Sequence, residues 1–129
     1  MEYEEVIVDD IERHFDYFTG FVSPEFSTGN FCLKDKSTMM YLQNGKIHRN
    51  NAPARIGYEA NIYERAHNLH KIVFTFYVNG RLHNENGSAI VHYCMRSNNR
   101  VDIREFYYLN GDEYSLTNWK KQLATKLYW

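Results

Sequence analysis

One stretch of this sequence occurs twice: residues 41–56 align without gaps on residues 76–91, which lie 35 positions later. The positions that recur in register are an aromatic residue, Asn-Gly, a base, an aliphatic residue, His, Asn and Ala. A third copy begins at residue 107 and then loses the pattern, with Asp112, Glu113 and Tyr114 at the positions of the base, the aliphatic residue and the His. Agreement at so many positions indicates a duplicated structural unit, whose copies must stack on one another to bury their apolar side chains.

Each copy carries the pattern of a β-hairpin. Asn-Gly is the preferred pair for a two-residue type I′ turn, because both central residues need a positive φ. β-rich runs precede the turns at 38–43, 71–78 and 104–109, short second arms follow at 46–48 and 81–83, and returning strands are expected at 54–56 and 89–95. Successive hairpins of this kind predict a curved, meandering antiparallel sheet, with Phe74, Phe76 and Phe106 in its core.

Helices are predicted only at the two ends of the chain. Near the start, Asp9 is a candidate N-cap with Glu12 three residues later, and an apolar face follows at Ile11, Phe15 and Phe18. Near the end, Ser115 or Thr117 is a candidate cap for an amphipathic helix with apolar residues at helical spacing: Leu116, Trp119, Leu123 and Leu127. The sequence therefore predicts an α+β fold in which a short N-terminal helix and a C-terminal helix flank the hairpin sheet.

The 129 residues fit a single domain, which the sequence divides into an acidic N-terminal segment (1–37), hairpin repeats (38–114) and the C-terminal helix (115–129). The net charge of -1 conceals a polarity, because residues 1–30 hold eight acids and only Arg13 as a base. No apolar run is long enough to span a membrane, and the first residues lack the features of a signal peptide. We therefore expect an intracellular protein without membrane contact, and two unpaired thiols at Cys32 and Cys94.

The interval between the first two copies is ambiguous, since residues 57–70 fit either a short helix or a long excursion between strands. On a helix, His67 and His70 would share one face with Glu64, as a metal site requires. However, both cysteines stand alone in apolar contexts, and no second paired ligand motif, phosphate-binding loop or nucleophile elbow is present. The sequence thus predicts no metal, no cofactor, no catalytic residues and no enzymatic activity.

The repeated histidines, His48 and His83, have two interpretations. They could be ligands or nucleotide-contacting groups that two hairpins present identically. Alternatively, each imidazole hydrogen-bonds the polar turn that follows it, where Asn side chains and backbone amides need partners. Regular recurrence inside a structural unit favours the structural role, and the terminal copy has Tyr114 at this position.

The pattern aromatic-x-x-Asn-Gly-Lys-x-His-Arg-x-x-Gly-Pro-Ala resembles a short repeat of small proteins from tailed bacteriophages and some bacteria, loosely similar to MORN repeats. The first copy matches at Tyr41, Asn44, Gly45, Lys46, His48, Arg49, Pro53 and Ala54, with Ala52 in place of Gly. The second copy matches at Phe76, Asn79, Gly80, His83, Gly87 and Ala89. The resemblance covers roughly residues 38–120. It implies a phage or prophage origin, a location in the bacterial cytoplasm and a binding role in host takeover or counter-defence, with no catalytic mechanism.

Two binding functions remain open. The first is a non-catalytic inhibitor of a host or defence-system protein, comparable to an anti-CRISPR protein. Its acidic N-terminal segment would occupy a basic surface. The candidate residues are Glu2, Glu4, Glu5, Asp9, Asp10, Glu12 and Asp16. This segment has an intramolecular alternative, in which it lies against the basic hairpins.

The second function is binding of nucleic acid or a nucleotide signal by a basic, aromatic sheet surface, in which aromatic rings stack on bases and cations contact phosphates. The candidate residues are Lys46, Arg81, Arg96, Arg100 and Arg104. The oligomeric state and the identity of any partner protein do not follow from the sequence.

Overall fold

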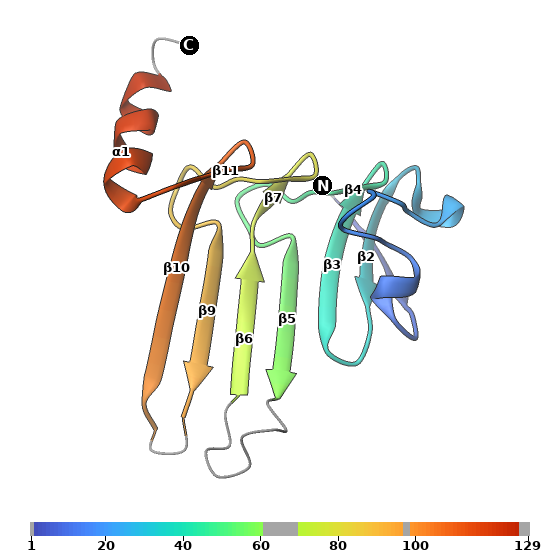
Figure 1. Cartoon of the computed structure of the whole chain (residues 1–129). Coiled ribbons are helices and arrows are strands. Elements are labelled where there is room, and N and C mark those ends of the chain that lie inside the picture. The colour runs from blue at the N-terminus through green and yellow to red at the C-terminus, as the bar shows by residue number, and fades with distance from the viewer. Residues whose placement is uncertain (1, 61–69, 97–98, 127–129) are drawn as a thin grey trace.

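A computed structural model describes residues 2–60, 70–96 and 99–126 (Figure 1). These residues form one open nine-stranded sheet in the order β1-β2-β3-β5-β6-β9-β10-β11, with β4 on the end of β3, and a small pair of strands, β7 and β8. The strands are β1 (Glu4–Ile7), β2 (Asn30–Lys34), β3 (Thr38–Gln43), β4 (Lys46–Ile47), β5 (Arg55–Ala60), β6 (His70–Thr75), β7 (Tyr77–Val78), β8 (Arg81–Leu82), β9 (Ile90–Met95), β10 (Val101–Leu109) and β11 (Asp112–Tyr114). With one C-terminal α-helix, the architecture is α+β, as predicted.

The three Asn-Gly pairs lie in the turns β3–β4, β7–β8 and β10–β11, all at the same end of the strands, at the top of Figure 1. Both residues of each pair have a positive φ, as type I′ turns require: 49° and 78° at Asn44-Gly45, 51° and 80° at Asn79-Gly80, and 51° and 88° at Asn110-Gly111. The second and third turns also bond to the second arm of the copy before them. The amide of Gly80 donates to the carbonyl of Ile47, and that of Gly111 donates to the carbonyl of Leu82, both at 2.8 Å.

The acidic N-terminal segment does not form the predicted helix. Its strand β1 pairs in parallel with β2. The helical structure in its described residues consists of two short 3-10 turns, Ile11–Arg13 and Pro24–Phe26. The first turn is capped by Asp10, whose carboxylate accepts from the amide of Glu12, instead of by Asp9. The carboxylate of Asp16 then accepts from the amide of Phe18 in a chain reversal that ends at Gly20. This local bond to the backbone competes with helix continuation.

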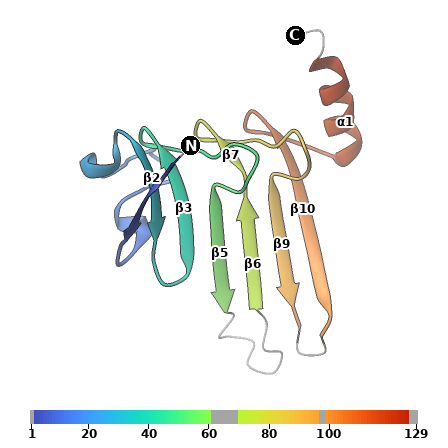
Figure 2. The ribbon, with the colours of Figure 1, turned by 180° about the vertical axis from the view of Figure 1, so that it is seen from behind.

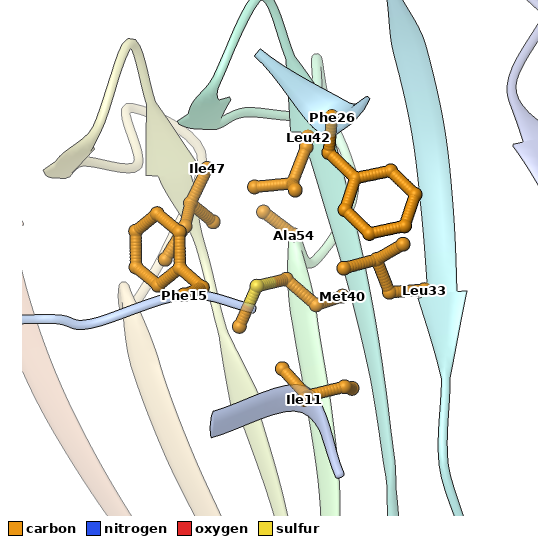
Figure 3. Close-up of a cluster of buried hydrophobic side chains, with 8 residues drawn as sticks. All are labelled: Ile11, Phe15, Phe26, Leu33, Met40, Leu42, Ile47 and Ala54. Carbon is orange, nitrogen blue, oxygen red and sulfur yellow. The ribbon is translucent and has the colours of Figure 1, made fainter. Parts of the chain in front are cut away.

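The buried core lies at the end of the sheet where this N-terminal segment crosses β2 and β3 (Figure 3). Three apolar side chains of the segment, those of Ile11, Phe15 and Phe26, pack on side chains of β2, β3 and β4 and on the residue that precedes β5. The cluster is completed by Leu33, Met40, Leu42, Ile47 and Ala54. The predicted core position of Phe74, Phe76 and Phe106 is wrong, because the three residues are only half-buried: Phe74 lies on β6, Phe106 on β10, and Phe76 between β6 and β7.

The other half of the sheet is a single layer. In Figures 1 and 2, no described helix or loop lies over either face of β6, β9 and β10, whereas the N-terminal segment reaches β5, where the hydroxyl of Tyr17 accepts from the guanidinium group of Arg55. The C-terminal helix α1 (Leu116–Thr125) follows β11 and contacts β10 and β11 at that side of the sheet. Its N-cap is Ser115, which accepts from the amide of Asn118, and its indole anchor Trp119 is buried and donates to the carbonyl of Asn84. Leu116 is exposed, so the apolar stripe of the helix is narrower than predicted.

The interval 57–70 is described only at its ends. Residues 57–60 continue β5 and His70 begins β6, while His67 and Glu64 of the predicted metal-site alternative lie outside the described residues. In the part of the chain that the structure describes, no helix has both the length and the apolarity to cross a membrane.

Candidate binding surfaces

Successive side chains of a strand point to opposite sides of a sheet, so the single-layer half, formed by β5, β6, β9 and β10, has two faces. We refer to the half formed by these four strands as the open half of the sheet; one of its faces is mainly apolar and the other mainly polar. Residues paired across neighbouring strands share a face. One row on the apolar face consists of Tyr58, Ile72, Tyr93 and Ile103, and the row beside it contains Ile56, Phe74 and Val91. We call the surface formed by these seven residues, together with Met95 and Val101, the apolar face; the same registers place the side chains of Glu105 and His70 on this side of the sheet.

Much of the apolar face is open to solvent. The exposed fractions are 56% for Ile103, 50% for Val101, 44% for Tyr58 and 40% for Met95. The rings of Phe74 and Tyr93 meet edge to face, with centroids 5.6 Å apart. A contiguous apolar patch on a folded protein commonly marks an interaction site, whereas single exposed apolar residues do not. Within the described residues, this face is therefore the best candidate for a protein contact.

Sequence reasoning missed the apolar face. In β6 and β9 both alternating sets of positions contain apolar residues, so the pattern does not show which set faces a core. In β10, by contrast, Val101 and Ile103 alternate with Asp102 and Arg104, a pattern that indicates one apolar and one polar face.

The five predicted basic residues do not form one surface. Lys46 and Arg81 are exposed at equivalent positions of β4 and β8, beside the turns. Arg96, Arg100 and Arg104 belong to the β9–β10 hairpin, and the first two form ion pairs with Asp102. The structure thus separates the predicted set into two groups.

The bases of the hairpin and several of the aromatic side chains are also separated. Arg104 pairs with His92 and shares the polar face with Lys71, whereas Phe74 and Tyr93 lie on the apolar face. A surface that stacks bases on rings and contacts phosphates with cations needs both kinds of side chain on the same side. Over β9 and β10 the polar face provides this combination only in part, since Phe106 lies two residues from Arg104 on the same side of β10 and meets the ring of His92 edge to face, with centroids 5.7 Å apart.

The predicted acidic residues are spread along the N-terminal segment. Glu2, Glu4, Glu5, Asp9 and Glu12 are exposed, and the Glu5 carboxylate accepts from the ammonium group of Lys34 at 3.0 Å. Asp10 and Asp16 are half-buried and cap local turns. Hydrogen bonds from the amide of Phe18 and the hydroxyl of Thr19 lower the pKa of Asp16.

The repeated histidines link neighbouring copies. Nδ1 of His48 accepts from the amide of Asn79, and Nδ1 of His83 accepts from the amide of Asn110, both at 2.9 Å. The predicted structural role is thus present, but each partner is the Asn-Gly turn of the next copy and not the turn that directly follows the histidine. Tyr114 has no further copy to contact, which agrees with the loss of His in the third copy.

We expect His48→Ala to lower the free energy of unfolding by about 1–3 kcal/mol, because the Asn79 amide loses its acceptor beside a buried side chain. His83→Ala removes the equivalent bond at a more exposed position and should cost less. Chemical denaturation of both variants measures the difference. Equal losses, or no loss in His48→Ala, would contradict the proposed link between copies.

No described group of three or more His, Cys, Asp or Glu residues is arranged to hold a metal ion. The ring of His70 instead hydrogen-bonds the hydroxyl of Tyr58 through Nδ1. Both cysteines are free, and burial raises the pKa of the Cys32 thiol, which disfavours the reactive thiolate.

The chain matches no protein-family model, no curated protein and no solved structure.

Proposed function

We propose that this protein is a non-catalytic binding protein that occupies a surface of another protein through its apolar face. The supporting observation is the uncovered face of β5, β6, β9 and β10, which presents Tyr58, Met95, Val101 and Ile103 to solvent. Burial of such a face is favourable by roughly 25 cal/mol per Å² of apolar surface. A partner with a matching apolar surface would therefore supply the second layer that this half of the sheet lacks.

The scaffold for this function is an array of three Asn-Gly hairpin copies. Its support is the recurrence of the same inter-copy bonds, from Gly80 to Ile47 and from Gly111 to Leu82, together with the two histidine bonds. Such links fix neighbouring hairpins relative to one another and keep the apolar face rigid. A rigid surface loses little conformational entropy on binding.

The resemblance to phage-associated repeats extends the proposal to the partner. A host protein or a defence-system protein in the bacterial cytoplasm would be bound and inhibited without any chemistry by this chain. The acidic N-terminal segment would then lie beside the interface and favour a partner with a basic rim. Binding of a nucleic acid is the alternative. It is supported less well, because Tyr58, Phe74 and Tyr93 lie on the face opposite Lys71 and Arg104, although Phe106 shares the face of these cations.

We expect Ile103→Arg to weaken capture of the partner by about tenfold or more, because it places a charge in the centre of an apolar contact. The measurement is a pull-down from host lysate at two salt concentrations, with and without nuclease. Leu116→Arg is the matched control, since Leu116 is an equally accessible aliphatic residue on α1, outside the apolar face. Capture of nucleic acid alone, lost steeply with salt, would favour the alternative.

A further inference from the structure

The polar face of the open sheet carries three basic side chains on three adjacent strands. Lys71 lies on β6, His92 on β9 and Arg104 on β10. His92 is directly opposite Arg104, and Lys71 is opposite Cys94, one diagonal step from His92. At these register positions the side chain of His92 is about 5–8 Å at Cβ from that of Arg104 and from that of Lys71. Lys71 and Arg104 are two strands apart, with β9 between them, and both line the same hollow.

The positive charges in this group are incompletely neutralised. The carboxylate of Glu59 is 3.9 Å from the ammonium group of Lys71, at the limit of an ion pair. Asp102 is already bonded to the guanidinium groups of Arg96 and Arg100. Among the described residues, no carboxylate forms an ion pair with Arg104. A bound anion would balance the positive charges of Lys71 and Arg104.

The side chains surround a hollow of about 310 Å³, whose walls include Lys71, His92, Arg96, Asp102 and Arg104. Burial lowers the pKa of His92, and Lys71 and Arg104 lower it further, against a smaller opposing effect of Glu59. The imidazole therefore lies in a positive electrostatic potential, which favours the binding of an anion.

We propose that this hollow binds a phosphate dianion, either free or as the monoester of a small molecule. Two permanent cations, Lys71 and Arg104, match the charge of about -2 that a phosphate group carries near neutral pH. The guanidinium group can donate two parallel hydrogen bonds to phosphate oxygens, and the ammonium group acts as a point charge beside it. The volume lies at the lower end of the range for small-molecule pockets, about 300–1,000 Å³.

A phosphate group fits this hollow better than a carboxylate does. A single carboxylate would neutralise only one of the two cations, whereas a dianion neutralises both. Most of its side chains point to the side of the strands opposite the apolar face, but the walls of the hollow also include Val101 and Ile103, which belong to the apolar face. The two cations proposed to bind phosphate, Lys71 and Arg104, are not part of the apolar face, so failure of one proposal leaves the other intact.

The test is titration of the full-length protein with inorganic phosphate and with adenosine monophosphate, followed by calorimetry and by NMR of the His92 ring. We expect saturable binding, an upward shift of the His92 pKa, and a loss of affinity of about tenfold in Arg104→Gln. Lys46→Gln is the matched control, because it removes one exposed positive charge at the turn edge. Tighter binding of the monoester would identify an organophosphate as the source, and equal affinities would identify free phosphate.

Three results would overturn the proposal. The first is the absence of saturable binding at millimolar phosphate. The second is an equal loss of affinity in Arg104→Gln and Lys46→Gln, which would indicate a diffuse charge effect instead of a site. The third is binding only to an oligonucleotide with a steep dependence on salt, which would indicate a polymer-binding surface. Because Arg104 is exposed, its substitution should leave the fold intact, and a melting curve checks this.

Discussion

Removal of residues 2–8 is expected to lower the free energy of unfolding by about 3–5 kcal/mol, a large part of the stability of a small domain. The deletion removes β1 and its parallel pairing with β2, together with the bond from the Val8 amide to the Lys34 carbonyl. It also removes Val6 and Val8, which pack against the core, and each buried aliphatic side chain is worth about 1.5–3 kcal/mol. Chemical denaturation measures the loss.

A charge-matched control separates this structural effect from a binding role of the acidic residues. The triple variant Glu2→Gln, Glu4→Gln, Glu5→Gln removes the same negative charges but keeps the strand. We expect its stability to change by less than about 1 kcal/mol, because exposed ion pairs such as Glu5–Lys34 contribute little. An unchanged melting temperature in the deletion variant, with loss of a partner, would instead show that the segment is an independent binding element.

The local features of the fold could be predicted from the sequence. Asn-Gly pairs determine their own backbone conformation, so the positions of the three turns follow from six residues. The helix after Ser115 could likewise be predicted from its cap and its apolar spacing. These features depend on neighbours in the chain, which is why sequence patterns reveal them.

The long-range features could not be predicted in the same way. Nothing in the segment Glu4–Ile7 indicates that it pairs in parallel with β2, across more than twenty intervening residues. The partners of His48 and His83 lie in the next copy, at sequence separations of 31 and 27. The single-layer half of the sheet was also unforeseen, because an apolar strand pattern does not reveal whether a second layer covers it.

A second large effect on the free energy of unfolding is expected at Asp35, whose carboxylate hydrogen-bonds both the N-terminal segment and the start of β3. One oxygen of its carboxylate accepts from the amide of Ile11 at 3.0 Å, and the other accepts from the amides of Ser37 and Thr38 at 3.0 and 2.8 Å. Ile11 is buried in the core, so loss of this acceptor leaves a donor there without a partner. We expect Asp35→Ala to cost about 2–4 kcal/mol of unfolding free energy, measured by denaturation at neutral pH.

The same carboxylate makes the stability depend on pH. Burial acts to raise the pKa of Asp35, but the hydrogen bonds from Ile11, Ser37 and Thr38 outweigh it, so the folded-state pKa lies below its ordinary value. The corresponding stabilisation is complete above the unfolded pKa of about 3.9 and is lost as the pH falls through the lower folded pKa. Wild type should therefore lose stability in this acidic range.

Asp35→Asn should show a flatter profile there, because its side chain no longer titrates. Its single amide oxygen can replace only one of the two accepting carboxylate oxygens, so its stability at neutral pH should also be lower than that of wild type. Asp102→Asn is the control, since Asp102 also has a lowered pKa, caused first by its hydrogen bond from Arg96, but lies on the exposed β9–β10 hairpin. We expect no comparable flattening in this variant, because solvent screens an exposed ion pair. Parallel acid profiles for wild type and Asp35→Asn would show that other carboxylates govern the acid stability of the N-terminal segment.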